Sequence, residues 1–178
     1  MKRVFLTAAL AALPAVALAV GFDDDTPPKT TPTTTTCKDT QIWDEQSKSC
    51  VDAQESRIDD DLRYRSVREL AYAGALDRAS DVLDTMSDQK SARVLTYRGF
   101  IARKTGDMQS ALSYYAAALE IDADNILTRS YLGQGLVTMG RMEDARAELA
   151  RIRALGGKGS WAETSLAQAL RTGQTYGY

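Results

Sequence analysis

The sequence of 178 residues predicts an all-α fold, an α-solenoid of stacked helix pairs. Three observations predict it. From Arg57 onward, apolar residues recur at spacings of three and four through segments of roughly 10 to 15 residues, which is the helical period. That part of the chain contains no proline, and glycines or short polar residues separate the segments. One pattern of residue types also returns at a fixed spacing, which is typical of repeat proteins.

The composition fits one soluble domain, with 44% apolar residues, 26% charged residues and a net charge of −2. The chain has no histidine, so it lacks the Ser-His and Cys-His pairs of many hydrolases and every histidine-bound metal. We therefore expect no enzymatic activity, no cofactor and no metal site. The balanced charge also lacks the basic excess of a nucleic-acid-binding protein, so no nucleic-acid partner is expected.

Residues 1–19 have the features of a secretory signal peptide. Two basic residues precede an apolar run, and Ala17-Leu18-Ala19 is the small-x-small pattern that signal peptidase accepts. A retained membrane anchor is the alternative, but Thr7 and Pro14 interrupt a run that is already short for a membrane span. We predict cleavage after Ala19, no integral span afterwards, and a periplasmic or secreted location.

Residues 20–36 are predicted to form a disordered linker, because this stretch is rich in Asp, Thr and Pro and has little apolar surface to bury. Cys37 and Cys50 follow it. Outside the cytosol two such cysteines usually pair, so residues 37–50 are expected to form a disulfide-stapled loop around Trp43. A redox-active pair is the alternative, which the spacing disfavours because it differs from Cys-x-x-Cys.

Breaks in the periodic pattern predict seven helices whose short connections make sequential helices antiparallel neighbours. The last helix is expected from Trp161 to Arg171, because Ser160 and Glu163 have the spacing of a capping box. Its apolar stripe suits a helix that covers the end of the stack, and residues 173–178 are expected to be a frayed tail. The predicted breaks are Ala73-Gly74, residues 87–90, Thr105-Gly106, residues 122–125, Met139-Gly140 and residues 156–159.

The internal repeat is clearest in the second half of the chain. With a shift of 34 residues, Gly99 falls on Gly133, Gly106 on Gly140 and Ala111 on Ala145, and a third copy precedes these two with a shift of 32. The period and the residue types resemble the tetratricopeptide repeat. The resemblance implies about three helix pairs plus a C-terminal capping helix over residues 57–172, with glycines where helices cross closely or turn sharply.

The resemblance also implies a concave groove, lined by the first helix of each pair, that binds proteins or peptides. Four of the positions it places in the groove are cationic and none is acidic, which favours an acidic peptide. A merely solvated helix face is the alternative. These positions are Tyr64, Arg68, Arg93, Thr96, Phe100, Arg103, Lys104, Leu127, Ser130, Gln134 and Val137.

The sequence thus predicts an exported scaffold or adaptor in the bacterial cell envelope, with a protein or peptide as its partner. A second hypothesis is a cell-wall or glycan-binding protein, in which Trp43 of the disulfide loop stacks on a sugar ring. A third idea is autoinhibition, in which residues 23–25 and 59–61, both runs of Asp, fold onto the basic groove. For residues 59–61 we favour a simpler role at the start of a helix, where acidic side chains complement the helix dipole.

Overall fold

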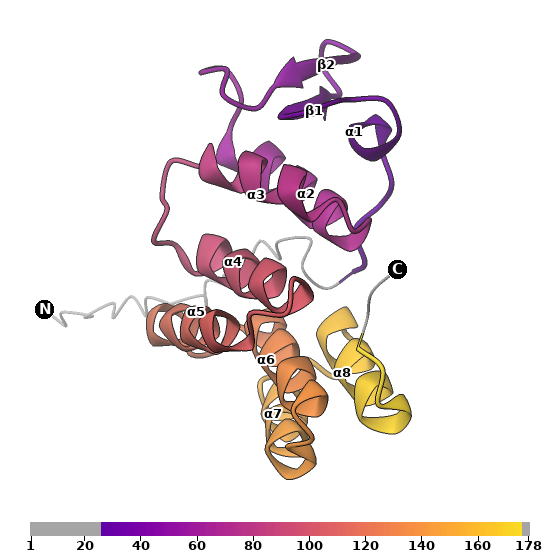
Figure 1. Ribbon diagram of the computed structural model, residues 1–178, viewed down its shortest axis with the longest axis vertical. Helices are drawn as coiled ribbons and strands as arrows, with labels where there is room; N and C mark the ends of the chain where they lie inside the picture. The colour runs from indigo at the N-terminus through magenta and orange to yellow at the C-terminus, as the bar shows by residue number, and fades with distance from the viewer. Residues whose placement is uncertain (1–25, 176–178) are drawn as a thin grey trace, which may run out of the picture.

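The computed structural model describes residues 26–175, so the predicted signal peptide and residues 20–25 of the predicted linker lie outside the described residues. The order of elements is α1 (Pro32–Thr35), β1 (Gln41–Asp44), β2 (Ser49–Asp52), α2 (Asp60–Tyr72), α3 (Leu76–Asp84), α4 (Ala92–Lys104), α5 (Met108–Ile121), α6 (Ile126–Thr138), α7 (Met142–Ala154) and α8 (Trp161–Thr172). Three helix pairs, α2–α3, α4–α5 and α6–α7, follow one another down the molecule, and α8 lies beside the last pair (Figure 1). The predicted all-α solenoid is therefore confirmed.

Local sequence signals set the helix boundaries. The side chains of Asp59, Asp107 and Asn125 each accept a backbone N–H in the first turn of the helix that follows. Gly74 and Gly140 end the first helix of their pairs with φ of 78° and 74°, a left-handed conformation that glycine adopts without strain. All six predicted breaks fall between helices.

Two glycines allow the close helix contacts that the repeat predicts. A Cβ atom on Gly99 would lie 2.5 Å from Cε1 of Tyr115 on α5, and one on Gly133 would lie 2.6 Å from Cδ2 of Leu166 on α8. Gly99 therefore meets the second helix of its own pair, whereas Gly133 meets the capping helix. Both glycines allow a close contact between helices, but the helices that they contact are not equivalent in the repeat.

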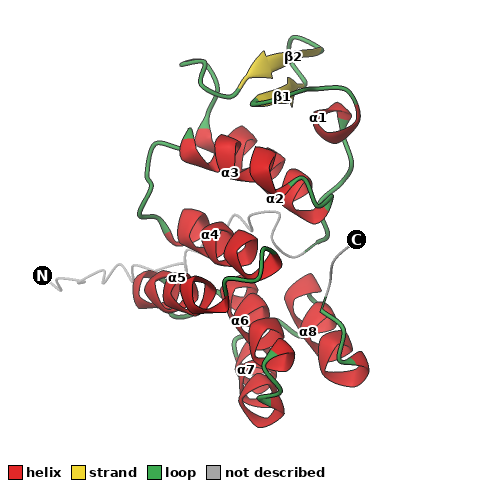
Figure 2. Cartoon of the chain, viewed as in Figure 1, coloured by secondary structure: helices red, strands yellow, loops and turns green. Residues whose placement is uncertain are grey.

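An antiparallel hairpin of β1 and β2, the only sheet within the described residues, precedes the repeats (Figure 2). The predicted disulfide between Cys37 and Cys50 is present and ties this hairpin to the turn after α1. The sequence did not indicate strands here. Residues 31–58, which we call the N-terminal cap, include the hairpin and lie on the side of α2 and α3 that faces away from α4 (Figure 1).

The N-terminal cap is packed and hydrogen-bonded onto the first helix pair. Ile42 and Ala53 are fully buried in the main hydrophobic core, together with residues of α2 and α3. The buried carboxylate of Glu69 on α2 accepts four hydrogen bonds, from the backbone N–H and hydroxyl groups of Thr31 and Thr34, at 2.6 to 3.2 Å. The prediction of a disordered linker is therefore wrong for residues 31–36. Glu69 supplies the hydrogen-bond acceptor that orders this segment, and the linker sequence itself contains no sign of it.

We predict that Gly99→Ala destabilises the protein by about 1–3 kcal/mol, because the new methyl group overlaps the Tyr115 ring. Gly135→Ala in α6 is the matched control. Its Cβ would lie 3.4 Å from Sδ of Met108, an ordinary contact, so the better helix propensity of alanine should leave stability unchanged or raise it by up to about 1 kcal/mol. Urea denaturation measures both variants, and equal effects would contradict the assigned helix contact.

Candidate functional site

The predicted groove residues lie on α2, α4 and α6, the first helices of the three pairs, as the repeat implies. We call the side of these helices that carries them, together with the facing side of α8, the inner face. Nine of the eleven residues are at most 6% exposed, whereas Arg93 and Lys104 are half-buried. The expectation that all eleven line an open groove therefore needs correction, since most of these side chains are packed against other side chains.

Aromatic rings account for much of this burial. Tyr72 stacks on Phe100 with ring centroids 5.5 Å apart, and Phe100 lies 4.9 Å from Tyr131. Tyr97 and Trp161 complete the group, which we call the aromatic cluster. Its members come from α2, α4, α6 and α8, so it joins the first helix of every pair to the capping helix.

A chain of hydrogen bonds runs through the aromatic cluster. Nε1 of Trp161 donates to the Tyr72 hydroxyl at 2.6 Å, and the Tyr131 hydroxyl lies 2.6 Å from that of Tyr72 and 3.2 Å from that of Tyr97. Trp161 thus packs in the core, as a helix-capping role suggests. Sequence reasoning did not single out Tyr72. The pairing of Tyr97 with Tyr131 in successive repeats was the available signal.

Three of the predicted groove residues hold neighbouring first helices together. The hydroxyls of Thr96 and Thr128 lie 2.6 Å apart and join α4 to α6. Ser130 contacts Ser165 at 3.0 Å and joins α6 to α8, while Nε2 of Gln134 lies 3.4 Å from both serine hydroxyls. The hydroxyl groups and the Gln134 Nε2 atom are thus satisfied within the protein, as polar groups in a core usually are, whereas Oε1 of Gln134 is buried without a hydrogen-bond partner in the described part of the chain.

The cations of the inner face differ in how they are held. Arg93 pairs with Asp61 at 2.6 Å and lies 5.1 Å above the Tyr64 ring. Arg68 donates to the Thr26 carbonyl at 2.8 Å. Arg103 lies 5.3 Å above the Phe100 ring, but its Nε and Nη2 atoms are buried without a hydrogen-bond partner in the described part of the chain.

The next residue, Lys104, adds a second charge at the C-terminal end of α4. Desolvation and the nearby Arg103 charge both lower the pKa of its ammonium group. The end of α4 therefore concentrates two positive charges in a partly dry environment. A carboxylate placed beside these two side chains would stabilise both positive charges.

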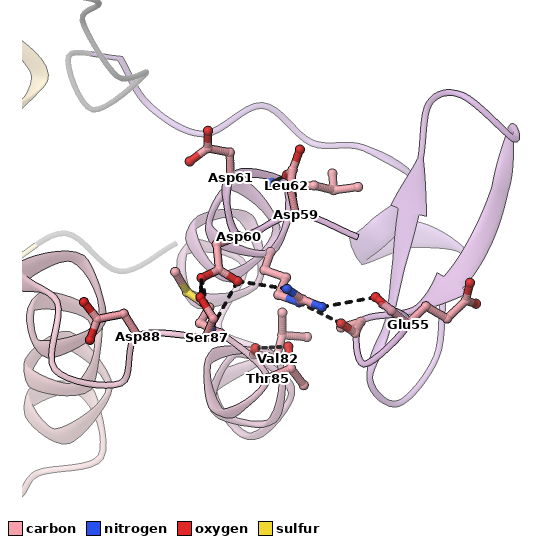
Figure 3. A network of polar contacts seen from close by, with 12 residues as sticks. Glu55, Asp59, Asp60, Asp61, Leu62, Val82, Thr85, Ser87 and Asp88 are labelled. Carbon is pink, nitrogen blue, oxygen red and sulfur yellow. Dashed lines mark hydrogen bonds and ion pairs between the residues drawn. The ribbon is translucent and has the colours of Figure 1, made fainter. Parts of the chain in front are cut away.

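The acidic run at residues 59–61 belongs to the fold. Asp59 caps α2, and Asp61 pairs with Arg93. Asp60 accepts from the backbone N–H and hydroxyl of Ser87 and from Arg63 (Figure 3). Burial alone would raise the pKa of Asp60, but these hydrogen bonds outweigh it and lower the pKa. Residues 59–61 are thus engaged in structure, and residues 23–25 lie outside the described residues.

A cleft of about 610 Å³ opens between α2, the hairpin and the segment of residues 26–33. Trp43, half-buried on β1, lies in its wall, and Leu62 of α2 also lines it. Arg65 and Lys29 are exposed cations of the same lining. Sequence analysis singled out Trp43 but gave no sign of the residues that complete the cleft around it.

The described residues contain neither a candidate metal site nor a candidate membrane-spanning helix. Within residues 26–175, no group of three or more His, Cys, Asp or Glu side chains is arranged to hold a metal ion. No helix in that range combines the length and the apolar character needed to cross a membrane.

Comparison with known proteins gives one match. Residues 102–171, from the end of α4 to the end of α8, match the model of the family described as tetratricopeptide repeat. No curated protein and no solved structure matches the chain. The match covers the part of the chain where the 34-residue repeat is clearest.

The buried tyrosines predict a loss of stability at alkaline pH. Burial raises the pKa of Tyr115 to about 12, although the Arg103 charge acts in the opposite direction, and burial also raises the pKa of Tyr131 well above 10. Both groups lose their proton more readily in the unfolded chain than in the fold. Their contribution is therefore fully present below pH 10, and it is lost as the pH rises toward 12.

We predict that the free energy of unfolding falls between pH 10 and 12 and that Tyr115→Phe makes this fall shallower. Phenylalanine keeps the ring that packs beside Gly99, so Tyr115→Phe should cost little stability at pH 8. Tyr114→Phe, at the half-buried neighbouring position, is the control. Urea denaturation across this pH range measures the slope, and identical slopes for both variants would refute the assignment.

Proposed function

We propose that this tetratricopeptide repeat protein is a non-catalytic scaffold that binds an acidic segment of a protein partner at the inner face, around the end of α4. The repeats support a scaffold for protein–protein interaction. The buried guanidinium of Arg103, whose Nε and Nη2 atoms lack a hydrogen-bond partner in the described residues, is the observation that carries the proposal.

A buried charged group without partners is costly, and a carboxylate relieves that cost better than any other protein group. Lys104 lies next to Arg103 and is half-buried, so it can approach the same carboxylate from the surface side. Because Nε and Nη2 of Arg103 are closed off from solvent in the free protein, an aspartate or glutamate of the partner would replace their missing hydrogen bonds only if the side chains over them moved on binding. The Phe100 ring lies beneath the guanidinium group of Arg103 and holds that group in place.

The disulfide supports a site of action in an oxidising compartment, since Cys37–Cys50 is compatible with export and such bonds are rare in the cytosol. The sequence of residues 1–19 supports the same location through its signal-peptide pattern. We therefore assign the scaffold to the periplasm or the extracellular side of a bacterial cell envelope.

The test starts by identifying the partner through crosslinking and mass spectrometry in the native cell, followed by titration of the purified partner. We expect Arg103→Met to weaken binding at least tenfold, since a hydrogen bond to a charged group contributes about 1.5–3 kcal/mol. The same change should cost the free protein little stability, because it removes the contact with the Phe100 ring but also removes two buried nitrogen atoms that lack hydrogen-bond partners there.

Arg146→Met on the exposed surface of α7 is the matched control, because Arg146 pairs, within the described residues, only with the exposed Glu143 on its own helix. It should bind the partner like the wild type. An unchanged affinity for Arg103→Met would refute the proposed site, and a marked loss of stability in that variant would mean that the guanidinium serves the fold.

A second candidate function is binding to the cell wall or to a glycan through Trp43. The specific observation in its favour is that Trp43 lies in the wall of the 610 Å³ cleft, a volume in the range of small-molecule sites. Aromatic side chains with polar neighbours are suited to stack on the C–H face of a sugar ring.

Pull-down on purified cell wall tests this candidate. We expect Trp43→Ala to lose retention while capture of the protein partner stays intact, because the cleft and the end of α4 share no lining residue. Equal retention of Trp43→Ala and wild type would eliminate the glycan-binding function.

A further inference from the structure

We infer that the cleft beside the N-terminal cap selects saccharides that carry carboxylate groups, with Trp43 as the platform for a sugar ring and with Lys29 and Arg65 as the groups that bind the carboxylates. This inference rests on the second candidate function, glycan binding at Trp43, and names the chemical class of its ligand. It is independent of the protein-binding site at α4.

Fixed contacts hold both walls of the cleft in place. On one side, Glu69 holds Thr31 and Thr34, and Arg68 holds the Thr26 carbonyl at 2.8 Å, so residues 26–34 are tied to α2 at both ends. On the other side, the backbone N–H of Trp43 donates to the Thr33 hydroxyl at 2.9 Å. The space between the walls is therefore present before a ligand arrives, which lowers the entropic cost of binding.

The Trp43 side chain is held in one orientation. Its Nε1 atom donates to Oε1 of Glu45 at 3.0 Å, and Glu45 is itself held by Lys48 at 2.6 Å. The indole is thus anchored by its polar edge while remaining partly open to the cleft. An immobilised, partly wet aromatic ring suits a ligand that has both an apolar face and polar edges, as a pyranose has.

Most of the charged side chains that line the cleft have partners within the protein. Arg57 pairs with Asp44 at 2.8 Å and with Glu55 at 2.8 Å. The carboxylate of Glu69 is saturated by four hydrogen bonds, and that of Asp59 caps α2. Each of these groups is held by contacts within the protein, but the donors to Glu69 and Asp59 are uncharged, so both carboxylates keep their negative charge.

Lys29 and Arg65 are the exceptions. Both are exposed, both line the cleft, and neither makes a hydrogen bond or an ion pair with any residue in the range 26–175. The cleft thus presents two cations without a partner among the described residues, one from the segment before α1 and one from α2. Carboxylates are the anions that an arginine fork binds in two-point fashion, and an acidic sugar brings them together with a ring for Trp43.

The volume fits a short oligosaccharide better than a folded partner. A cleft of about 610 Å³ lies within the range that encloses ligands of drug-like size, and a chain of two or three sugar rings is of that size. An acidic peptide would satisfy the same cations but would not need the fixed indole. It is therefore the competing occupant that the experiment has to separate.

The experiment titrates the full chain without its signal peptide with three probes of similar length, namely trigalacturonic acid, neutral maltotriose and tri-aspartate. The readout is the indole N–H signal of Trp43 in ¹H–¹⁵N NMR spectra. The sequence has two tryptophans, and the buried Trp161 serves as an internal reference for the fold. We expect trigalacturonic acid to shift the Trp43 signal and to bind at least tenfold more tightly than either other probe.

Arg65→Ser is the diagnostic variant, because Arg65 is exposed without a partner in the described residues and its removal leaves the fold intact. It should remove the preference for trigalacturonic acid over maltotriose. Arg171→Ser, at another exposed cation on α8 that has no partner within residues 26–175, should keep that preference.

Each other outcome has a distinct meaning. Equal affinity for trigalacturonic acid and maltotriose, or a preference that survives Arg65→Ser, would overturn the acid selectivity and leave glycan binding standing. Binding of tri-aspartate as tight as that of trigalacturonic acid would overturn the saccharide assignment in favour of a peptide. No shift of the Trp43 signal with any saccharide would overturn both the inference and the glycan-binding function.

Discussion

A helix pair buries its apolar side only against a neighbouring element, so a stack of pairs is stable only if both ends are covered. This requirement organises the whole chain. At one end α8 supplies Leu166, which fills the space left by Gly133. At the other end the N-terminal cap supplies Ile42 and Ala53, which are fully buried in the core of the first pair. The disulfide and the Glu69 hydrogen bonds let a segment without a core of its own fulfil this task.

The inner face also results from the stacking of the helix pairs. Its contacts extend further than those between neighbouring pairs. Nε1 of Trp161 reaches the hydroxyl of Tyr72 across a separation of 89 residues. The capping helix therefore contacts the first pair as well as the third, and the aromatic cluster couples the ends of the stack. Rings in this position bury a large apolar area and also satisfy their polar atoms within the cluster. The side chains of the aromatic cluster therefore fill the inner face, where the repeat pattern predicted an open groove.

Structural features that depend on local sequence patterns could be predicted from the sequence. Helix breaks at Gly74 and Gly140, the cap at Ser160 and the disulfide depend on one or a few neighbouring residues, and each is present. The order of residues 31–36 was missed because Thr31 is held by Glu69, 38 residues away, and composition carries no trace of such a contact. The burial of Phe100 was missed for a similar reason, since its position in the repeat predicts the helix face but not the ring of Tyr72 that covers it.

The two candidate sites differ in how their cations are solvated, and this difference decides what each can bind. Arg103 is almost fully buried, so a carboxylate must lose its water to reach it, and the contacts of a large protein interface are needed to offset that cost. Arg65 and Lys29 remain in water, where a single ion pair contributes little and needs a second interaction to produce selectivity. In the cleft that second interaction is the fixed indole of Trp43. The covering of one end of the stack thus creates, between the cap and α2, a cleft that the repeats alone do not contain.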